Sequence, residues 1–220
     1  MKIDAVIFDM DGVIFDSERA YMVCCIEVGK KYNLENVEEV CLKCIGINSR
    51  ETARILYESY GDSFPLEKYR QEVYELFREV YGNGKLPVKE GVQELLGYLK
   101  SAGVPMAIAS STKSSDVKME LDEARLLKYF DKVIGGEMVE RSKPEPDIFL
   151  KAAEELGMEP ENCLVIEDSH NGVRAAYTAG MTPVMVPDLL EPTPEMKEKT
   201  AAIYKTLLDV IGFMETRGEY

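Results

Sequence analysis

The sequence contains no apolar stretch that approaches the roughly 20 residues of a membrane-spanning helix. Basic residues are also in short supply, because 26 Lys and Arg stand against 40 Asp and Glu and leave a net charge of −14. A basic patch is the usual footprint of nucleic-acid binding, so this charge disfavours nucleic acid as a partner. The chain has no internal repeat and no low-complexity segment. We therefore expect a globular protein that binds neither membranes nor nucleic acid.

A framework of paired cysteines is not expected, because the chain has five cysteines, an odd number that suits a reducing compartment. No secretory leader precedes the first apolar run, so we expect a cytoplasmic protein. Cys41 and Cys44 have CxxC spacing, and Cys24-Cys25 lies nearby. A zinc site needs about four ligands, and a redox pair is expected near a βαβ unit. We interpret these thiols as structural, with a metal or redox role as alternatives.

Two acids, Asp9 and Asp11, follow directly on a short apolar run that begins at Ala5. A buried strand has no use for two carboxylates at its end unless a cation lies there. Ligands bind at the carboxyl ends of the strands in open parallel sheets, and side chains two residues apart lie on one side of an extended chain. Gly12 allows the backbone to turn sharply afterwards. The alternative, a helix cap, explains one acid but not the pair, so we interpret this segment as a strand that delivers two acids to an active site.

Three further segments bring polar residues to the ends of apolar runs or to a loop. They are Ser110-Ser111-Thr112 after Val104–Ala109, Lys143 before Pro144, and Glu167-Asp168 after Cys163–Ile166. Four converging carboxylates would repel one another strongly. A bound Mg²⁺ would relieve this repulsion, because it is held by carboxylates, waters and phosphate oxygens. Taken singly, Lys143 could be an ordinary surface lysine and Ser110 an ordinary turn residue, but together the segments predict a site for Mg²⁺ and a phosphate.

The order of the expected elements predicts the architecture. From Val88 onward, short apolar runs alternate with helical patterns such as 90–101, 147–156 and 172–179, which favours a parallel sheet with right-handed crossovers. Residues 17–85 have helical stripes and no strand-like run. We therefore expect an α/β, Rossmann-like parallel sheet core of residues 1–16 and 86–220 with an inserted all-α helical-bundle cap of residues 17–85. The length of 220 residues suffices for one sizeable core and a smaller cap.

In this order the motifs resemble those of the haloacid dehalogenase superfamily. They are Asp9-x-Asp11-Gly12-Val13, Ser110, Lys143-Pro144 and Glu167-Asp168-Ser169-x-x-Gly172. One DxDG motif alone would be a weak signal, but four motifs in family order span essentially the whole chain. Within the superfamily the chain is similar to the β-phosphoglucomutase-like branch, whose members carry a helical cap after the first strand.

The resemblance implies a mechanism through an aspartyl-phosphate. Asp9 would attack phosphorus, and Asp11 would protonate the leaving alkoxide and then take a proton from the attacking water. Lys143 and Ser110 would stabilise the charge on the equatorial phosphate oxygens.

The resemblance also implies a magnesium cofactor. Mg²⁺ would be held by the Asp9 carboxylate, the backbone carbonyl of Asp11 and the Asp168 carboxylate. Glu167 would either bind the ion directly or lie just behind its ligands.

The resemblance is less decisive about the substrate. In the sugar phosphomutases of this branch, a cap arginine and the loop after the hydroxyl motif hold a second phosphate. Arg50 matches the cap position, and Thr112 and Lys113, next to Ser111, match the loop. Arg50 could hold a distal anion by a bidentate fork. The alternative is that Arg50 pairs with a neighbouring acid on the helix surface, which is worth little.

One position departs from the mutases. Tyr21 stands where they carry a cap histidine, and the single histidine of the chain is His170. A mutase must protect its aspartyl-phosphate from water, so we favour a phosphatase of a small phosphorylated metabolite, with a sugar phosphate as the first candidate. The alternatives are a β-phosphoglucomutase-like sugar phosphomutase and a non-catalytic binding protein on the same fold. We expect a monomer or a weak homodimer.

Overall fold

The computed structural model describes residues 3–47 and 49–217, and its centre is a six-stranded sheet in the order β3-β2-β1-β4-β5-β6. The strands are β1 (Ala5–Phe8), β2 (Met106–Ser110), β3 (Lys132–Gly135), β4 (Cys163–Glu167), β5 (Thr182–Met185) and β6 (Ala202–Ile203). All five neighbouring pairs are parallel, with Val6 opposite both Met106 and Leu164. The prediction of an α/β, Rossmann-like parallel sheet is confirmed.

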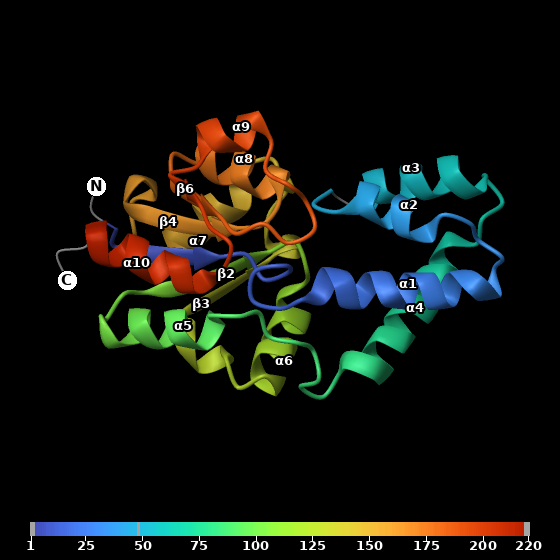
Figure 1. The fold of residues 1–220 in the computed structure, drawn as a ribbon, viewed down its shortest axis with the longest axis horizontal. Helices are drawn as coiled ribbons and strands as arrows, with labels where there is room; N and C mark the ends of the chain where they lie inside the picture. The colour runs from blue at the N-terminus through green and yellow to red at the C-terminus, as the bar shows by residue number, and fades with distance from the viewer. Residues whose placement is uncertain (1–2, 48, 218–220) are drawn as a thin grey trace.

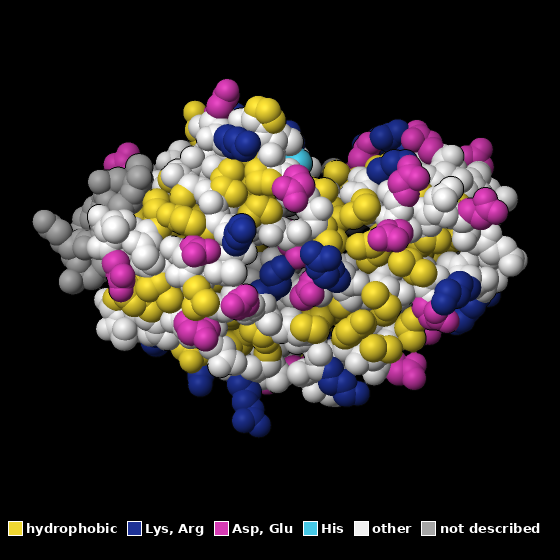
Figure 2. Space-filling model, viewed as in Figure 1, with side chains coloured by type: hydrophobic (Ala, Val, Ile, Leu, Met, Phe, Trp, Pro, Cys, Tyr) yellow, Lys and Arg dark blue, Asp and Glu magenta, His cyan; other side chains and the backbone are white. Residues whose placement is uncertain are grey.

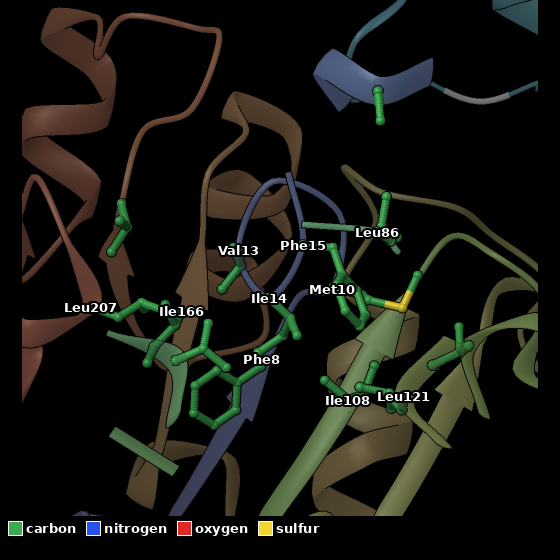
Figure 3. Packing of buried hydrophobic residues seen from close by; sticks show 14 of the residues in the cluster. Phe8, Met10, Val13, Ile14, Phe15, Leu86, Ile108, Leu121, Ile166 and Leu207 are labelled. Carbon is green, nitrogen blue, oxygen red and sulfur yellow. The ribbon is translucent and has the colours of Figure 1, made fainter. Parts of the chain in front are cut away.

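Helices cover both faces of the sheet, which explains why its central strands are apolar throughout. Val6 and Phe8 of β1 face the side covered by α5 (Val92–Ser101) and α10 (Leu207–Arg217). Figure 3 shows this packing, in which Phe8 lies beside Ile108 of β2 and Ile166 of β4. The alternate residues of β1 face α7 (Asp147–Leu156) and α8 (His170–Thr178) on the other side. The period of two along β1 therefore divides the core into two layers.

The remaining elements of the sheet region are short. They are α6 (Ser114–Glu123), α9 (Pro194–Lys199) and the single 3₁₀ turns Leu127–Tyr129, Gly136–Met138 and Pro160–Asn162. The helix expected over 147–156 is confirmed as α7, and the one expected over 90–101 begins at Val92. The helix expected from Gly172 begins two residues earlier, because the Ser169 hydroxyl caps it by accepting a hydrogen bond from the backbone of Gly172.

Between β1 and α5 the described part of the chain forms four helices. They are α1 (Ser17–Lys31), α2 (Val37–Cys44), α3 (Ser49–Tyr60) and α4 (Leu66–Tyr81), which we call the four-helix segment. Figure 1 shows this segment to the right of the sheet, beyond the ends of the strands. Its interior holds Val28 and Val73, both fully buried, together with packed rings of Tyr32, Phe64 and Tyr69. The four helices fall within residues 17–85, and the exact division into core and cap stays a prediction.

The two crossings between the sheet region and the four-helix segment lie side by side. The backbone N–H of Asp16 donates to the carbonyl of Pro87 at 2.9 Å, and that of Lys89 donates to the carbonyl of Ile14 at 2.9 Å. An isolated bridge pairs Phe15 with Val88 in the same place. The segment is therefore inserted through one double-stranded connection.

The surface shows charged side chains of both signs over both parts, and an indentation separates the two parts at the top of this view (Figure 2). Within the part of the chain that the structure describes, no helix is both long and apolar enough to cross a membrane.

Candidate active site

A cavity of about 450 Å³ lies where the carboxyl ends of β1, β2 and β4 face the four-helix segment. Residues of both parts line it. They are Asp9, Asp11, Ser17, Glu18, Tyr21, Cys44, Gly46, Ile47, Tyr74, Phe77, Ser111, Thr112, Asp116, Glu120, Lys143, Glu167, Asp168 and Ser169. The topology thus joins all four sequence motifs at the edge of the sheet where α/β proteins bind ligands.

Lys143 lies at the centre of this site and is buried. Its ammonium donates to Asp9 Oδ1 at 2.5 Å, to Glu167 Oε1 at 2.7 Å and to the carbonyl of Ala109 at 3.2 Å. Burial by itself lowers the pKa of Lys143, but the two carboxylates outweigh burial and hold the pKa above its usual value. Lys143 is therefore a fixed positive charge beside Asp9 and not an ordinary surface lysine.

The carboxylate of Glu167 is held from both sides. Its Oε1 binds Lys143, while its Oε2 accepts hydrogen bonds from the backbone of Asp168 at 2.9 Å, the backbone of Ser169 at 2.8 Å and the Ser169 hydroxyl at 3.0 Å. Gly172 leaves the space that this carboxylate occupies, since a Cβ there would lie 1.7 Å from Glu167 Oε1. Glu167 thus has the geometry of a group that positions Lys143.

Replacing Gly172 with Ala is expected to destabilise the fold by about 1–3 kcal/mol, because the new methyl group must displace a buried, hydrogen-bonded carboxylate. Glycine-to-alanine exchanges inside helices usually stabilise instead, by about 0.5–1 kcal/mol. Gly97 of α5 is the matched control, because a Cβ there meets nothing within 4 Å. Urea unfolding of both variants tests the difference in sign. Equal stabilisation of both would show that Glu167 does not occupy this space.

Asp11 is oriented by three hydroxyl groups. Its Oδ1 accepts from Ser17 at 2.7 Å, and its Oδ2 accepts from Ser110 at 3.2 Å and from Thr112 at 3.1 Å. The Ser110 hydroxyl in turn accepts from the backbone of Thr112 at 3.0 Å. Ser110 is fully buried and is not among the described residues that line the cavity. The Ser110 hydroxyl therefore helps to hold the carboxylate of Asp11 at the cavity wall.

Three acids could hold a cation. Oxygen atoms of Asp9, Glu167 and Asp168 lie within 4.8 Å of one another, and all three residues are buried. Burial is the main cause that raises the pKa of both Asp9 and Asp168, and the neighbouring carboxylates raise these pKa values further. The Asp168 carboxylate has no hydrogen-bond or ion-pair partner within residues 3–47 and 49–217.

Two features of these acids fit a hard cation. Gly12 adopts φ +78°, and a Cβ there would lie 2.3 Å from Asp168 Oδ2. Because glycine has no Cβ, the carboxylate of Asp168 can lie close to the backbone of Gly12. A buried carboxylate without a partner and two more within reach form the all-oxygen donor set that Mg²⁺ prefers. The side chain of Asp11 is not part of this group, and its oxygens accept hydrogen bonds from Ser17, Ser110 and Thr112.

The predicted substrate-binding residues divide into two sets. Tyr21, Ser111 and Thr112 line the cavity. Arg50 and Lys113 are exposed, and neither is among its described lining residues. Arg50 lies in the first turn of α3, and Lys113 lies at the start of α6. The structure therefore does not bring these two cations to the cavity, and their proposed grip on a distal anion stays a prediction.

Several lining residues were missed from the sequence, above all Glu18, Asp116 and Glu120. Burial is the main cause that raises the pKa of Glu18 to about 8 and of Glu120 to about 7, and Asp11 raises both further. Ser17 and Glu18 follow the DxDG segment closely, which is a signal for their position. The two acids of α6 give no such signal, because a helical acid usually faces solvent.

Comparisons with known proteins agree with this arrangement. A family model described as haloacid dehalogenase-like hydrolase matches residues 6–186. The phosphorylated carbohydrates phosphatase of Thermotoga maritima is 36% identical over 178 residues, which cover 81% of this chain and 82% of that protein. A mutant of CbbY from Rhodobacter sphaeroides, solved in complex with xylulose-1,5-bisphosphate, has a TM-score of 0.76 at 26% identity and covers 93% of this chain and 95% of that chain. A β-phosphoglucomutase from Clostridium difficile has a TM-score of 0.80 at 23% identity, covers 98% of this chain and 96% of that chain, and is a likeness of fold alone.

Proposed function

The chain belongs to the haloacid dehalogenase-like hydrolase family, and on that premise we propose that it is a Mg²⁺-dependent phosphatase of a small phosphorylated metabolite. It is a phosphoric monoester hydrolase, like the phosphatases to which it is similar. The observation that carries the proposal is the meeting of Asp9, Asp11 and Lys143 at one edge of the sheet. A carboxylate, a second acid and a fixed cation in one cavity are the groups that phosphoryl transfer to a carboxylate needs.

Asp9 is the nucleophile in this proposal. Lys143 binds its Oδ1, which leaves Oδ2 to attack phosphorus and form an aspartyl-phosphate. With a phosphate bound at Asp9, the ammonium of Lys143 would also stabilise the negative charge that increases on the phosphate oxygens in the transition state. Glu167 keeps Lys143 in place through its 2.7 Å contact.

Asp11 is the general acid and base. It would give a proton to the leaving alkoxide and later take one from the water that hydrolyses the aspartyl-phosphate. The hydroxyls of Ser17, Ser110 and Thr112 fix its direction, so that the same carboxyl group can serve both steps without moving.

The metal would be held by the carboxylates of Asp9 and Asp168 and the backbone carbonyl of Asp11, with Glu167 beside them. Bound there, Mg²⁺ would neutralise the carboxylates and polarise the phosphoryl group.

The charges of the cavity favour hydrolysis over a mutase reaction. Among its described lining residues Lys143 is the one cation, and two carboxylates already bind it. Glu18, Asp116 and Glu120 also line the wall. A second phosphate, as in the bisphosphate intermediate of a mutase, would meet no further cation among these described residues, and it would be repelled by each of the three acids that is ionised. A substrate with one phosphate avoids this repulsion.

The test is a split assay followed by ³¹P NMR. With Mg²⁺, the protein is given glucose 6-phosphate and other metabolite monophosphates, and separately β-glucose 1-phosphate with a trace of the sugar bisphosphate. We expect free phosphate from at least one monophosphate and no release in the presence of EDTA. Rapid formation of glucose 6-phosphate with little free phosphate would instead identify a mutase. No reaction of any of these compounds would favour a binding protein on the same fold.

A further inference from the structure

A second cavity, of about 170 Å³, lies inside the four-helix segment, and we call it the inner chamber. All four helices contribute to its wall, which is mostly apolar. Its buried lining residues include Cys25, Val37, Val40, Ile45, Leu56 and Tyr69. An interior usually leaves few voids of this size, because side chains in cores pack as densely as organic crystals. The chamber therefore has room for part of a ligand.

The inner chamber adjoins the active-site cavity. Glu18, Tyr21 and Cys44 line both of them. Tyr21 stands at the junction with its ring against Phe77, at a centroid separation of 6.1 Å. Asp9 and Lys143 line the active-site cavity but not the chamber. A substrate bound by its phosphate at Asp9 can therefore extend its leaving group past Tyr21 toward the chamber.

The lining of the chamber suits a ring better than a polyol. Its described charged residues are Glu18 and Arg70, and most of the others offer carbon or sulfur. A sugar would bury several hydroxyls there against a wall with few polar side chains, and each hydroxyl left unpaired would cost roughly 1–3 kcal/mol. An apolar cavity of about 150 Å³ stays dry and accepts benzene. A chamber of 170 Å³ can therefore accept one ring of that size.

We infer that the leaving group of the substrate carries an apolar ring, which occupies the inner chamber while the phosphate binds at Asp9 and Lys143. This inference rests on the proposed phosphatase function and narrows its substrate class. A plain sugar phosphate leaves the chamber empty, whereas a phosphomonoester whose alcohol bears an aromatic ring fills it. Transfer of the ring from water into the chamber is favourable. Such a substrate also carries no second anionic group that would have to bind near the acids of the active-site cavity.

The test compares esters that differ only in the ring. We expect 2-phenylethyl phosphate or 4-phenylbutyl phosphate to show a kcat/KM at least about tenfold above ethyl phosphate or butyl phosphate, since burying a ring-sized apolar group commonly gives that factor or more. All four leaving groups are primary alkoxides, so differences in leaving-group basicity do not enter. Glucose 6-phosphate serves as the polyol comparison.

A variant that fills the chamber tests its role directly. Cys41 lines the chamber from α2, so C41F places a ring in it, whereas Leu42, the next residue, is exposed and does not line it. We expect the ratio of kcat/KM between phenyl and alkyl esters to fall toward one in C41F and to persist in L42F. V40F, from the same helix, is the second filling variant should C41F fail to fold in a circular dichroism melt.

Two results would overturn the inference but leave the proposed function standing. One is equal kcat/KM for alkyl and phenylalkyl esters with the wild-type protein, and the other is an unchanged ratio of kcat/KM between these esters in a folded filling variant. If none of the esters and none of the metabolite monophosphates, glucose 6-phosphate included, is hydrolysed, the proposed function itself is wrong and the inference falls with it. Hydrolysis of glucose 6-phosphate without any preference for a ring separates these two failures.

Discussion

Replacing Asp9 with Asn is expected to reduce phosphate release to background, a loss on the order of 10⁴-fold or more. The amide cannot attack phosphorus, so no covalent intermediate forms, and Lys143 then has no reacting group beside it. The assay measures inorganic phosphate at saturating Mg²⁺ with the best substrate of the wild-type protein. D122N is the matched control, because Asp122 is an exposed residue of α6 that does not line the cavity.

The same exchange should leave the fold intact, which separates chemistry from stability. Burial raises the pKa of Asp9, so ionising this group inside the protein is unfavourable and a neutral amide removes that cost. Lys143 keeps its contacts with Glu167 and with the carbonyl of Ala109. We expect the midpoint of thermal unfolding to stay level or to rise. Full activity in a folded D9N protein would show that the nucleophile lies elsewhere.

The sequence predicted best those features that depend on patterns along one segment. The apolar runs that end in Asp9, Ser110 and Glu167 became β1, β2 and β4, because a strand buried on both faces must be apolar throughout. Lys143 lies 134 residues from Asp9 along the chain, yet the order of the motifs was sufficient to place it in the same site.

Features with short or ambiguous patterns were missed. Helix α2 has eight residues with Val37 and Val40 as its buried positions, which is too little for a helical stripe to stand out. Strand β6 has two residues. Glu120 looks like any solvated helical acid in the sequence, and only the packing of α6 beside the cavity reveals its place.

The inner chamber belongs to a third kind of feature, one that no sequence pattern reports. Helical periodicity indicates that Cys25 and Tyr69, which line the chamber, are buried. It does not say whether the side chains that meet them fill the space completely, because that depends on how four helices cross. The exposure of Arg50 and Lys113 is a similar case, since the motif fixes their place in the chain but not the direction in which α3 and α6 present them.

Replacing Lys143 with Met is expected to lower the free energy of unfolding by about 3–5 kcal/mol at about pH 8 in EDTA, and to abolish turnover. Methionine is similar in length and apolar, so the loss comes from charge more than from volume. Without the ammonium, Asp9, Glu167 and Asp168 remain buried close together with no cation. K151M is the matched control, because Lys151 of α7 pairs with Glu154 and Glu155 at the surface, where ion pairs contribute little.

The response to pH and metal shows whether the lost charge is the cause. Burial and neighbouring carboxylates already raise the pKa of Asp9 and Asp168, and removing Lys143 removes the group that lowers both. A carboxyl whose pKa is higher in the folded than in the unfolded protein stabilises the fold below its unfolded pKa of about 4, and this stability is lost as the pH rises through the folded value. In EDTA, K143M should therefore regain more stability than K151M between about pH 8 and pH 6.

Added Mg²⁺ should restore part of the stability of K143M at the higher pH, because a cation bound by Asp9 and Asp168 replaces the missing positive charge. Urea unfolding at both pH values, with and without Mg²⁺, measures the effect. A variant that unfolds like K151M under all four conditions would mean that the three carboxylates need no compensating charge. The ion pairs around Lys143 would then have no part in holding the site together, and its contribution would be confined to the phosphate.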